Sequence, residues 1–166
     1  MPLLKIIEMT STDVTFSVAF VFLQHESEDN FKWALDVLRG IINDSALPHA
    51  IVTDRDLTLM NAISQAFPNA THLLCRWHIN KNVLAKCKKL FSTKEWWDFF
   101  MTYWNLVVLS PTEEDYDNHI ALLEKQFSPY LNALDYVRSW LDTYRDRFVI
   151  AWTDRVLHLG ATTMNK

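Results

Sequence analysis

Alternating apolar and polar positions predict two strands at the start of the chain. Residues 3–9 form an apolar run, residues 10–13 a polar turn, and residues 14–23 a second run. In the second run the large apolar side chains recur at every second position, which is the period of a strand. The pattern predicts a hairpin with large side chains on one face and small ones on the other, so that packed elements can cover both faces. The large residues of this run are Val14, Phe16, Val18, Phe20 and Phe22.

Helical and extended segments alternate from Ser27 to Lys89. Ser27 is a suitable N-cap, and Glu28 and Asp29 after it favour the positive end of a helix. Apolar residues then recur at helical spacing, and short apolar runs separate the helical segments. This order implies right-handed crossovers and an α/β fold, with a mixed sheet that carries helices on its faces. The pattern predicts helices over 27–43, 57–67 and 77–89, and strands over 49–53 and 72–75.

The second half of the chain changes to a helical pattern. Ser92-x-x-Glu95 and Ser110-Pro111-x-Glu113 both fit the capping box that starts a helix, the second with proline at the first helical position. Ser128-Pro129 marks another start. The region from Ser92 to about Tyr144 therefore predicts an all-helical layer attached to the sheet half. Its many aromatic residues, within a total of Trp 7 and Phe 10, indicate a core and also an interface.

Length and composition favour a soluble, intracellular protein with one compact domain. The chain has 166 residues, and an apolar share of 49% is enough to build a core. No run of about 18 apolar residues suggests a membrane span, and the start does not fit a signal peptide. Cys75 and Cys87 are expected to be thiols, as is usual in a reducing compartment.

The charges are segregated along the chain, although the net charge is only -4. No acidic residue occurs from Leu57 through Lys94, whereas residues 95–146 are strongly acidic. A basic strip of this kind suits a polyanion such as DNA, but a solvated helix face would look the same. The lysines do not share one helix face, so they favour diffuse phosphate attraction over base reading. The predicted DNA contacts are Arg76, Lys81, Lys86, Lys88 and Lys89.

Asp54 is the first candidate for a chemical role. It directly follows the apolar run 49–53, and an aspartate at the carboxyl end of a strand projects at the edge where α/β proteins handle ligands. A carboxylate there can bind Mg²⁺ together with substrate phosphates. The alternative is that Asp54 only caps a helix that begins at Arg55, and the local sequence by itself favours this alternative.

Cys75-Arg76-Trp77-His78 is the second candidate. A thiolate and an imidazole three residues apart can supply half of a zinc site. No second half with ligand spacing is evident, so a packed structural role is the alternative, and spacing favours it. The chain also has no glycine-rich phosphate loop and no serine or cysteine nucleophile signature.

Taken in order, the motifs resemble the Mutator-like element (MULE) transposase domain. The far-red-impaired-response family of plant transcription factors, which derives from such transposases, looks similar. The resemblance spans nearly the whole chain, and it depends on the order and spacing of motifs that are individually weak. The matching segments are 1–4, 16–22, 26–33, 51–56, 67–72, 75–82 and 148–153.

The resemblance implies a ribonuclease H-like fold in which Asp, Asp and Glu hold two Mg²⁺ or Mn²⁺ ions for DNA strand cleavage and transfer. Asp54 falls on the second carboxylate of that triad, which reverses the local preference for a helix cap. Cys75 and His78 fall on the C-x-x-H element of the family. The implied organisation is a partial core over 1–90, a helical insertion over 91–147, and the truncated start of a returning core segment over 148–166.

The resemblance places the other two carboxylates outside the chain. The first is expected upstream of the segment matching 1–4, and the third shortly after the segment matching 162–165. Asp13, in the predicted turn, is no substitute. Glu113 and Glu114 become candidates only if the tail aligns differently.

The expected function is therefore that of a nuclear transposase fragment. It would bind DNA, in the intact protein at the transposon terminal repeats, and it would not cut DNA alone. One alternative is a domesticated protein that binds DNA or regulates transcription on the same scaffold. Another is a helical interaction module that uses exposed tryptophans, and self-association is a further expectation.

Overall fold

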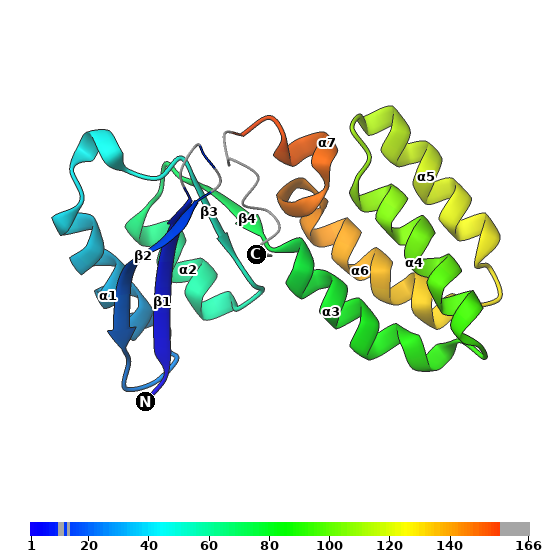
Figure 1. The fold of residues 1–166 in the computed structure, drawn as a ribbon, viewed down its shortest axis with the longest axis horizontal. Helices are drawn as coiled ribbons and strands as arrows, with labels where there is room; N and C mark the ends of the chain where they lie inside the picture. Colours follow the sequence, from blue (N-terminus) through cyan, green and yellow to red (C-terminus); the bar gives the residue numbers. More distant parts are fainter. Residues whose placement is uncertain (10–11, 13, 157–166) are drawn as a thin grey trace. The chain divides into compact units, whose positions relative to one another are not determined.

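The computed structural model describes residues 1–9, 12 and 14–156. Asp13 and the predicted segment 162–165 lie outside the described residues. Contacts divide the chain into two compact units, with Met1–Leu74 in the first and Cys75–Arg155 in the second. Each unit is built differently, the first from strands and helices and the second from helices alone (Figure 1). The chain is thus a mixed α/β protein, as predicted.

The predicted hairpin is confirmed. Strand β1 (Leu3–Met9) pairs antiparallel with β2 (Thr15–Phe22), with a register irregularity between Ile6 and Ile7. On one face of the pair, Leu4, Ile6 and Val21 pack against the core of the first unit. The core they contact consists of Leu23, Phe31, Ala34, Leu35, Ala62, Ile63, Ala66 and Phe67.

The sequence pattern allowed packed elements to cover the other face of the hairpin as well, but among the described residues that face is exposed. Phe20 is 58% exposed and Phe22 is 64% exposed, while the Lys5 ammonium lies 5.7 Å from the centre of the Phe20 ring. Phe16 and Val18 are also exposed. Strand periodicity places these side chains on one face correctly, but it does not show what packs against that face.

Two helices and a parallel strand pair complete the first unit. Helix α1 (Glu28–Ile41) packs on α2 (Leu57–Ala66), and the Glu28 carboxylate accepts hydrogen bonds from Asn61 Nδ2 at 3.0 Å and Gln65 Nε2 at 2.7 Å. A short 3₁₀ turn, η1 (Asp44–Ala46), leads to β3 (Ala50–Thr53). This strand pairs in parallel with β4 (Thr71–Leu74), and α2 connects the two strands in sequence. The two strand pairs form separate sheets among the described residues, not the single mixed sheet expected.

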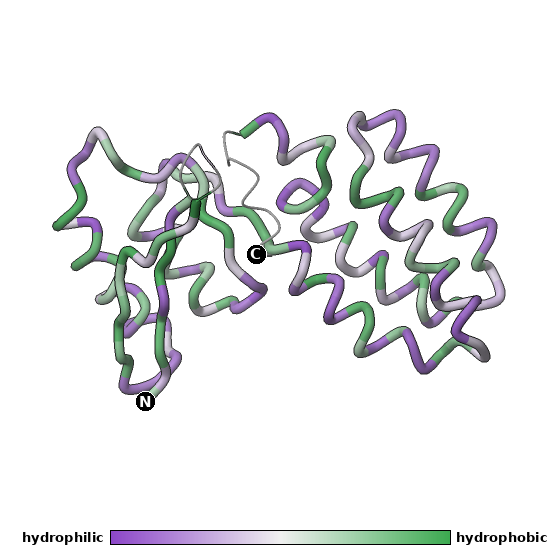
Figure 2. Tube along the Cα trace, in the orientation of Figure 1, coloured by the Kyte–Doolittle hydropathy of each residue, from purple (hydrophilic) through white to green (hydrophobic). Residues whose placement is uncertain are grey.

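The second unit is a helical array around an aromatic core. Figure 2 shows hydrophobic and hydrophilic residues alternating along its helices, as expected when one face of each is buried. Phe100, Trp104, Phe127 and Phe148 are fully buried. No described helix is long and apolar enough to cross a membrane. The elements are α3 (Arg76–Cys87), η2 (Lys88–Leu90), α4 (Lys94–Val108), α5 (Glu113–Gln126), α6 (Leu131–Phe148) and α7 (Ile150–Thr153).

Both predicted capping boxes are wrong by one or two residues. Thr93, not Ser92, caps α4, because its hydroxyl accepts from the Trp96 N–H at 3.4 Å. Thr112 caps α5 by accepting from the Asp115 N–H at 3.0 Å. Ser110, the predicted cap of that helix, is buried and donates to the Leu106 carbonyl. Neighbouring serine and threonine residues fit a capping pattern equally well. Which of them accepts from the N–H three residues later depends on where the backbone becomes helical.

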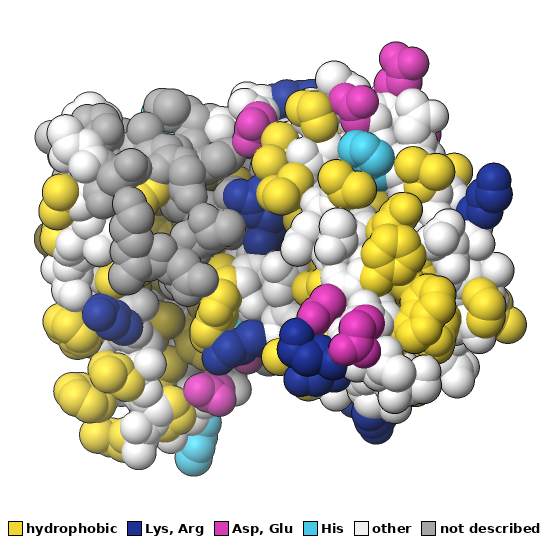
Figure 3. Space-filling view, turned by 45° about the vertical axis from the view of Figure 1, so that its right-hand side comes forward, with side chains coloured by type: hydrophobic (Ala, Val, Ile, Leu, Met, Phe, Trp, Pro, Cys, Tyr) yellow, Lys and Arg dark blue, Asp and Glu magenta, His cyan; other side chains and the backbone are white. Residues whose placement is uncertain are grey.

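The tandem Trp96 and Trp97 divide between surface and core. Trp97 is 5% exposed, whereas Trp96 is 42% exposed. Phe99, Leu106 and Leu122 are also exposed, and Figure 3 shows hydrophobic side chains gathered on the surface of these helices. The predicted aromatic core is therefore present in this unit, while the predicted interface stays a prediction.

Substitution of Phe127 tests the aromatic core. The centre of its ring lies 5.2 to 6.4 Å from the centres of six other aromatic rings. We expect Phe127→Ala to lower the free energy of unfolding by about 3–5 kcal/mol, as a lost buried aromatic ring does. Leu131, which is 61% exposed, is the control, and Leu131→Ala should change the free energy of unfolding by less than about 0.5 kcal/mol. Urea denaturation followed by circular dichroism measures both, and equal effects would contradict the assigned core.

Candidate functional site

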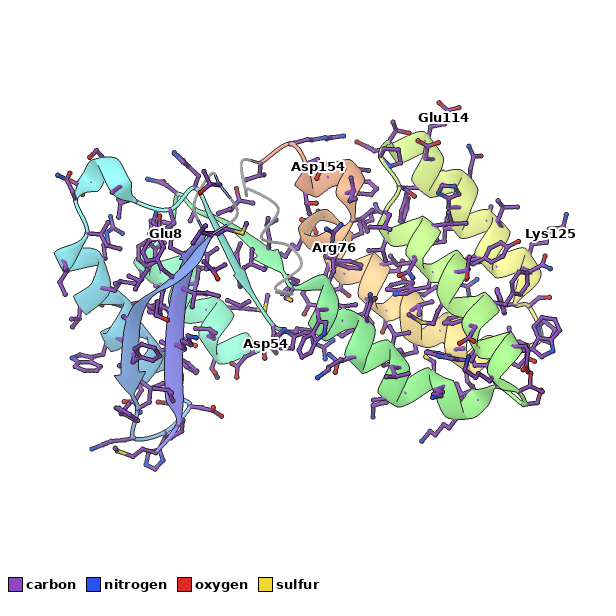
Figure 4. The ribbon with its side chains drawn as sticks, in the orientation of Figure 1. Glu8, Asp54, Arg76, Glu114, Lys125 and Asp154 are labelled. Atoms are coloured by element: carbon purple, nitrogen blue, oxygen red, sulfur yellow. The ribbon has the colours of Figure 1, made fainter. Side chains whose placement is uncertain are left out.

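Asp54 lies directly after β3, at the carboxyl end of the parallel pair (Figure 4). Its side chain is exposed. No hydrogen bond or ion pair engages its carboxylate within the part of the chain that the structure describes. Its position matches the prediction, and the carboxylate is available to a ligand.

Asp56, two residues later, is the residue that caps α2. Its carboxylate accepts from the Leu59 N–H at 2.9 Å and from the Thr58 hydroxyl, and its carbonyl accepts the first helical hydrogen bond from the Met60 N–H. Burial acts to raise the pKa of Asp56, but the hydrogen bonds from Thr58 and Leu59 outweigh it and hold the pKa below its usual value of 3.8. The alternative role for Asp54, as the cap of a helix beginning at Arg55, is wrong because α2 begins at Leu57.

Thr53 connects the end of β3 to β4. Its hydroxyl oxygen lies 2.8 Å from the carbonyl oxygen of Asp54 and 2.7 Å from Nε2 of His72 on the neighbouring strand. The parallel register pairs Ile51 with His72 and Thr53 with Leu74. The backbone of Asp54 is thus anchored through Thr53 on one side, and the capped start of α2 follows on the other.

A shallow pocket of about 140 Å³ adjoins this strand end. Asp54, Asp56 and Glu26 line it together with apolar side chains from β1 and α2. The described residues contain no group of three or more His, Cys, Asp or Glu side chains that could hold a metal ion. Mg²⁺ is often held by one or two protein carboxylates, with water and substrate phosphates completing its octahedron. Asp54 fits the role of one such ligand.

Cys75 and His78 lie at the start of α3. Cys75 is fully buried at the N-cap position, and the His78 ring meets Trp77 edge-on with 4.7 Å between ring centres. His78 Nδ1 is buried and has no hydrogen-bond partner among the described residues. Both Cys75 and Cys87 are free cysteines, and burial raises the pKa of Cys87 to about 11, so its thiol stays protonated. A zinc site at Cys75 and His78 stays a prediction.

The predicted DNA contacts differ in their surroundings. Lys86, Lys88 and Lys89 are exposed at the end of α3 and in η2. The Lys81 ammonium stacks on the Trp77 ring at 3.7 Å from its centre. Arg76 is only partly exposed: burial lowers its pKa, and the charge of Asp154, near it in Figure 4, acts in the opposite direction. The three clustered lysines are therefore the groups best placed to attract phosphates.

Sequence reasoning missed the hydrogen bonds made by Thr53, Asp56 and His72. For Asp56 a signal existed, since an aspartate three residues before a helical N–H is a usual cap. The bond between Thr53 and His72 has no such signal, because it depends on the register of two strands separated by a helix.

Comparison with known proteins bears out the family resemblance. The family model of the MULE transposase domain matches residues 1–82. Protein FAR-RED IMPAIRED RESPONSE 1 of Arabidopsis thaliana is 27% identical over 143 residues, which are 85% of this chain and 16% of that protein. Protein FAR1-RELATED SEQUENCE 5 of the same plant is 29% identical over 141 residues, 81% of this chain and 17% of that protein.

A fungal protein also matches. The PKS-NRPS hybrid synthetase cheA of Chaetomium globosum is 31% identical over 93 residues, 55% of this chain but 2% of that protein. The chain therefore spans less than a fifth of the length of these relatives.

The different structural roles of Asp54 and Asp56 can be tested by measuring the free energy of unfolding of variants at each position. We expect Asp56→Ala to lower the free energy of unfolding by about 1 kcal/mol through loss of the cap, and Asp54→Ala to change it by less than about 0.5 kcal/mol. Because the folded pKa of Asp56 is lowered, its contribution is present at neutral pH and disappears as the pH falls from the usual 3.8 through the lower folded value. Denaturant titrations of both variants at pH 7 and pH 3 measure this, and a larger loss for Asp54→Ala would contradict the assignment.

Proposed function

We propose that this chain, a relative of MULE transposases, is part of a module that binds and processes DNA, in which Asp54 supplies one carboxylate to a divalent metal site of the complete protein. The observation that carries the proposal is the Asp54 carboxylate at the carboxyl end of β3, which is exposed and has no partner among the described residues, within the segment that matches the transposase family. The ribonuclease H-like arrangement of the complete core is part of the same proposal.

The division between Asp54 and Asp56 supports this role. A carboxylate that accepts hydrogen bonds from Thr58 and Leu59 has fewer lone pairs for a cation, whereas Asp54 has no such partner among the described residues. A bound Mg²⁺ or Mn²⁺ would polarise a scissile phosphate and activate water for strand cleavage. Asp54 would hold that ion at the strand edge, beside the pocket.

Asp54 alone is an incomplete site. The described residues bring no group of three or more His, Cys, Asp or Glu side chains together, and we propose that the remaining carboxylates come from the rest of the complete protein. Cys75 and His78 would likewise need further ligands to hold zinc, and without them they serve in packing. We therefore assign the cutting activity to the complete protein and not to this chain.

The lysines supply the attraction for DNA. Lys86, Lys88 and Lys89 are exposed within four residues, and no acidic residue occurs between Leu57 and Lys94. Exposed lysines gain affinity for phosphates by releasing counterions, which does not require base reading. In the complete protein the DNA would be the transposon terminal repeats, and the compartment the nucleus.

A domesticated DNA-binding or regulatory protein is the second candidate. The observation that favours it is the coverage of the FAR-RED IMPAIRED RESPONSE relatives, which match 81–85% of the chain and therefore reach into the helical unit, beyond the residues matched by the transposase family model. Such a protein would keep DNA binding and would not need the metal.

Nicking assays test the assignment of the cutting activity. Supercoiled plasmid carrying terminal-repeat DNA, incubated with this chain and Mg²⁺ or Mn²⁺, should stay uncut. Nicking that disappears in Asp54→Asn would show that the chain holds a complete site and would overturn our claim. In the complete protein, Asp54→Asn should abolish cutting if it is a transposase, and should leave DNA binding unchanged if it is a regulator.

Salt dependence tests the DNA contacts. In fluorescence anisotropy with duplex DNA, replacing Lys86, Lys88 and Lys89 by Ala should lower the slope of log affinity against log salt by roughly 2 to 3, about 0.9 for each lost phosphate contact. The matched control replaces three lysines outside this strip, Lys5, Lys32 and Lys125, of which Lys32 is paired with Asp36. Equal effects of the two triple variants, or binding that ignores salt, would contradict a phosphate-binding strip and would favour the helical interaction module.

A further inference from the structure

The hydroxyl of Thr53 stands between the backbone of Asp54 and the imidazole of His72. Its oxygen is 2.8 Å from the Asp54 carbonyl oxygen and 2.7 Å from His72 Nε2. Thr53 is the last residue of β3, and His72 lies within β4. The contact therefore crosses between the two strands at the edge where Asp54 projects.

The chemistry of the three groups fixes the direction of both hydrogen bonds. A carbonyl oxygen can only accept, so the single proton of the Thr53 hydroxyl must point to Asp54 for that bond to exist. Both bonds are made at once only if His72 Nε2 carries a proton and donates it to the Thr53 oxygen. His72 then donates to the Thr53 hydroxyl, and the Thr53 hydroxyl donates to the carbonyl of Asp54.

We infer that Thr53 and His72 are positioning residues for the Asp54 carboxylate. The bond to its carbonyl fixes the peptide plane that follows Asp54, and the Asp56 cap fixes the start of α2 two residues later. The backbone at Asp54 is held between these two anchors, which set the direction of its Cα–Cβ bond and so the edge at which its carboxylate projects. This inference rests on the proposed role of Asp54 as a metal ligand.

The arrangement matches what supporting groups do around metal ligands. Partners that orient a ligand without touching the metal commonly change metal affinity by 10-fold or more when they are removed. Thr53 is well suited to this task because its branched side chain stays ordered in a strand while its hydroxyl reaches the next carbonyl.

Manganese binding to the whole chain, followed by NMR, tests the inference without any activity. Mn²⁺ broadens the backbone amide signals near its site even when it binds weakly. In the wild type we expect broadening centred on residues 54–56, and its loss in Asp54→Asn. In Thr53→Val and His72→Phe we expect the Mn²⁺ concentration for half-broadening to rise about 10-fold.

Conservative variants separate positioning from a general loss of stability. Thr53→Ser keeps the hydroxyl, and His72→Gln keeps an N–H donor, so both should stay within about 3-fold of the wild type. The matched control is Ser64→Ala, which removes another side-chain hydroxyl bond in the same unit, from Ser64 to the Met60 carbonyl at 3.0 Å. It should leave Mn²⁺ binding unchanged whatever it does to the melting temperature.

Two results would overturn different claims. If Asp54→Asn abolishes the broadening but Thr53→Val and His72→Phe behave as the wild type, the positioning inference fails and the proposed function stands. If the wild type shows no broadening that depends on Asp54, the proposed metal role fails, and the amide shifts and ¹⁵N relaxation of residues 54 and 55 decide the inference. Unchanged shifts and relaxation in Thr53→Val and His72→Phe would overturn it, and altered values in both variants, absent in Ser64→Ala, would support it.

Discussion

The parallel pairing of β3 and β4 is the constraint on which the candidate site depends. Parallel strands need a crossover, and α2 supplies it within the seventeen residues between Thr53 and Thr71. The chain must therefore leave β3 and turn into a helix within three residues. That turn exposes Asp54 at the strand edge, while the parallel register of β3 and β4 brings Thr53 next to His72.

The pair would be marginal without the helices that cover it, because an isolated two-stranded sheet is barely stable in water. Helices α1 and α2 supply the apolar surface, and the bonds from Asn61 and Gln65 to Glu28 fix their relative register. The Arg39 guanidinium also donates to the Ala66 carbonyl and satisfies an acceptor at the end of α2. The core that these helices form also packs against Ile51 of β3, so the strand that leads to Asp54 is part of the packed unit.

Periodicity was enough to locate the elements, because burial on one face leaves a regular trace in the sequence. The strands of the hairpin and the helices α1 and α2 lie within one to two residues of their predicted bounds. The caps at Thr93 and Thr112 were missed because adjacent hydroxyl residues satisfy the same pattern. The exposed face of β2 was missed because periodicity reports which side chains share a face, while the element covering that face is a tertiary property.

The candidate site was only half predictable for a related reason. Asp54 could be placed at a strand end from local sequence. Either Asp54 or Asp56 could cap the helix that follows, and which of them does so depends on the residue at which that helix begins. Once Asp56 accepts the N–H of Leu59, its carboxylate is committed to the helix terminus, as the lowered pKa of Asp56 indicates. The two aspartates of this short turn thus differ in their contacts, because Asp56 caps α2 and the carboxylate of Asp54 stays exposed at the strand edge.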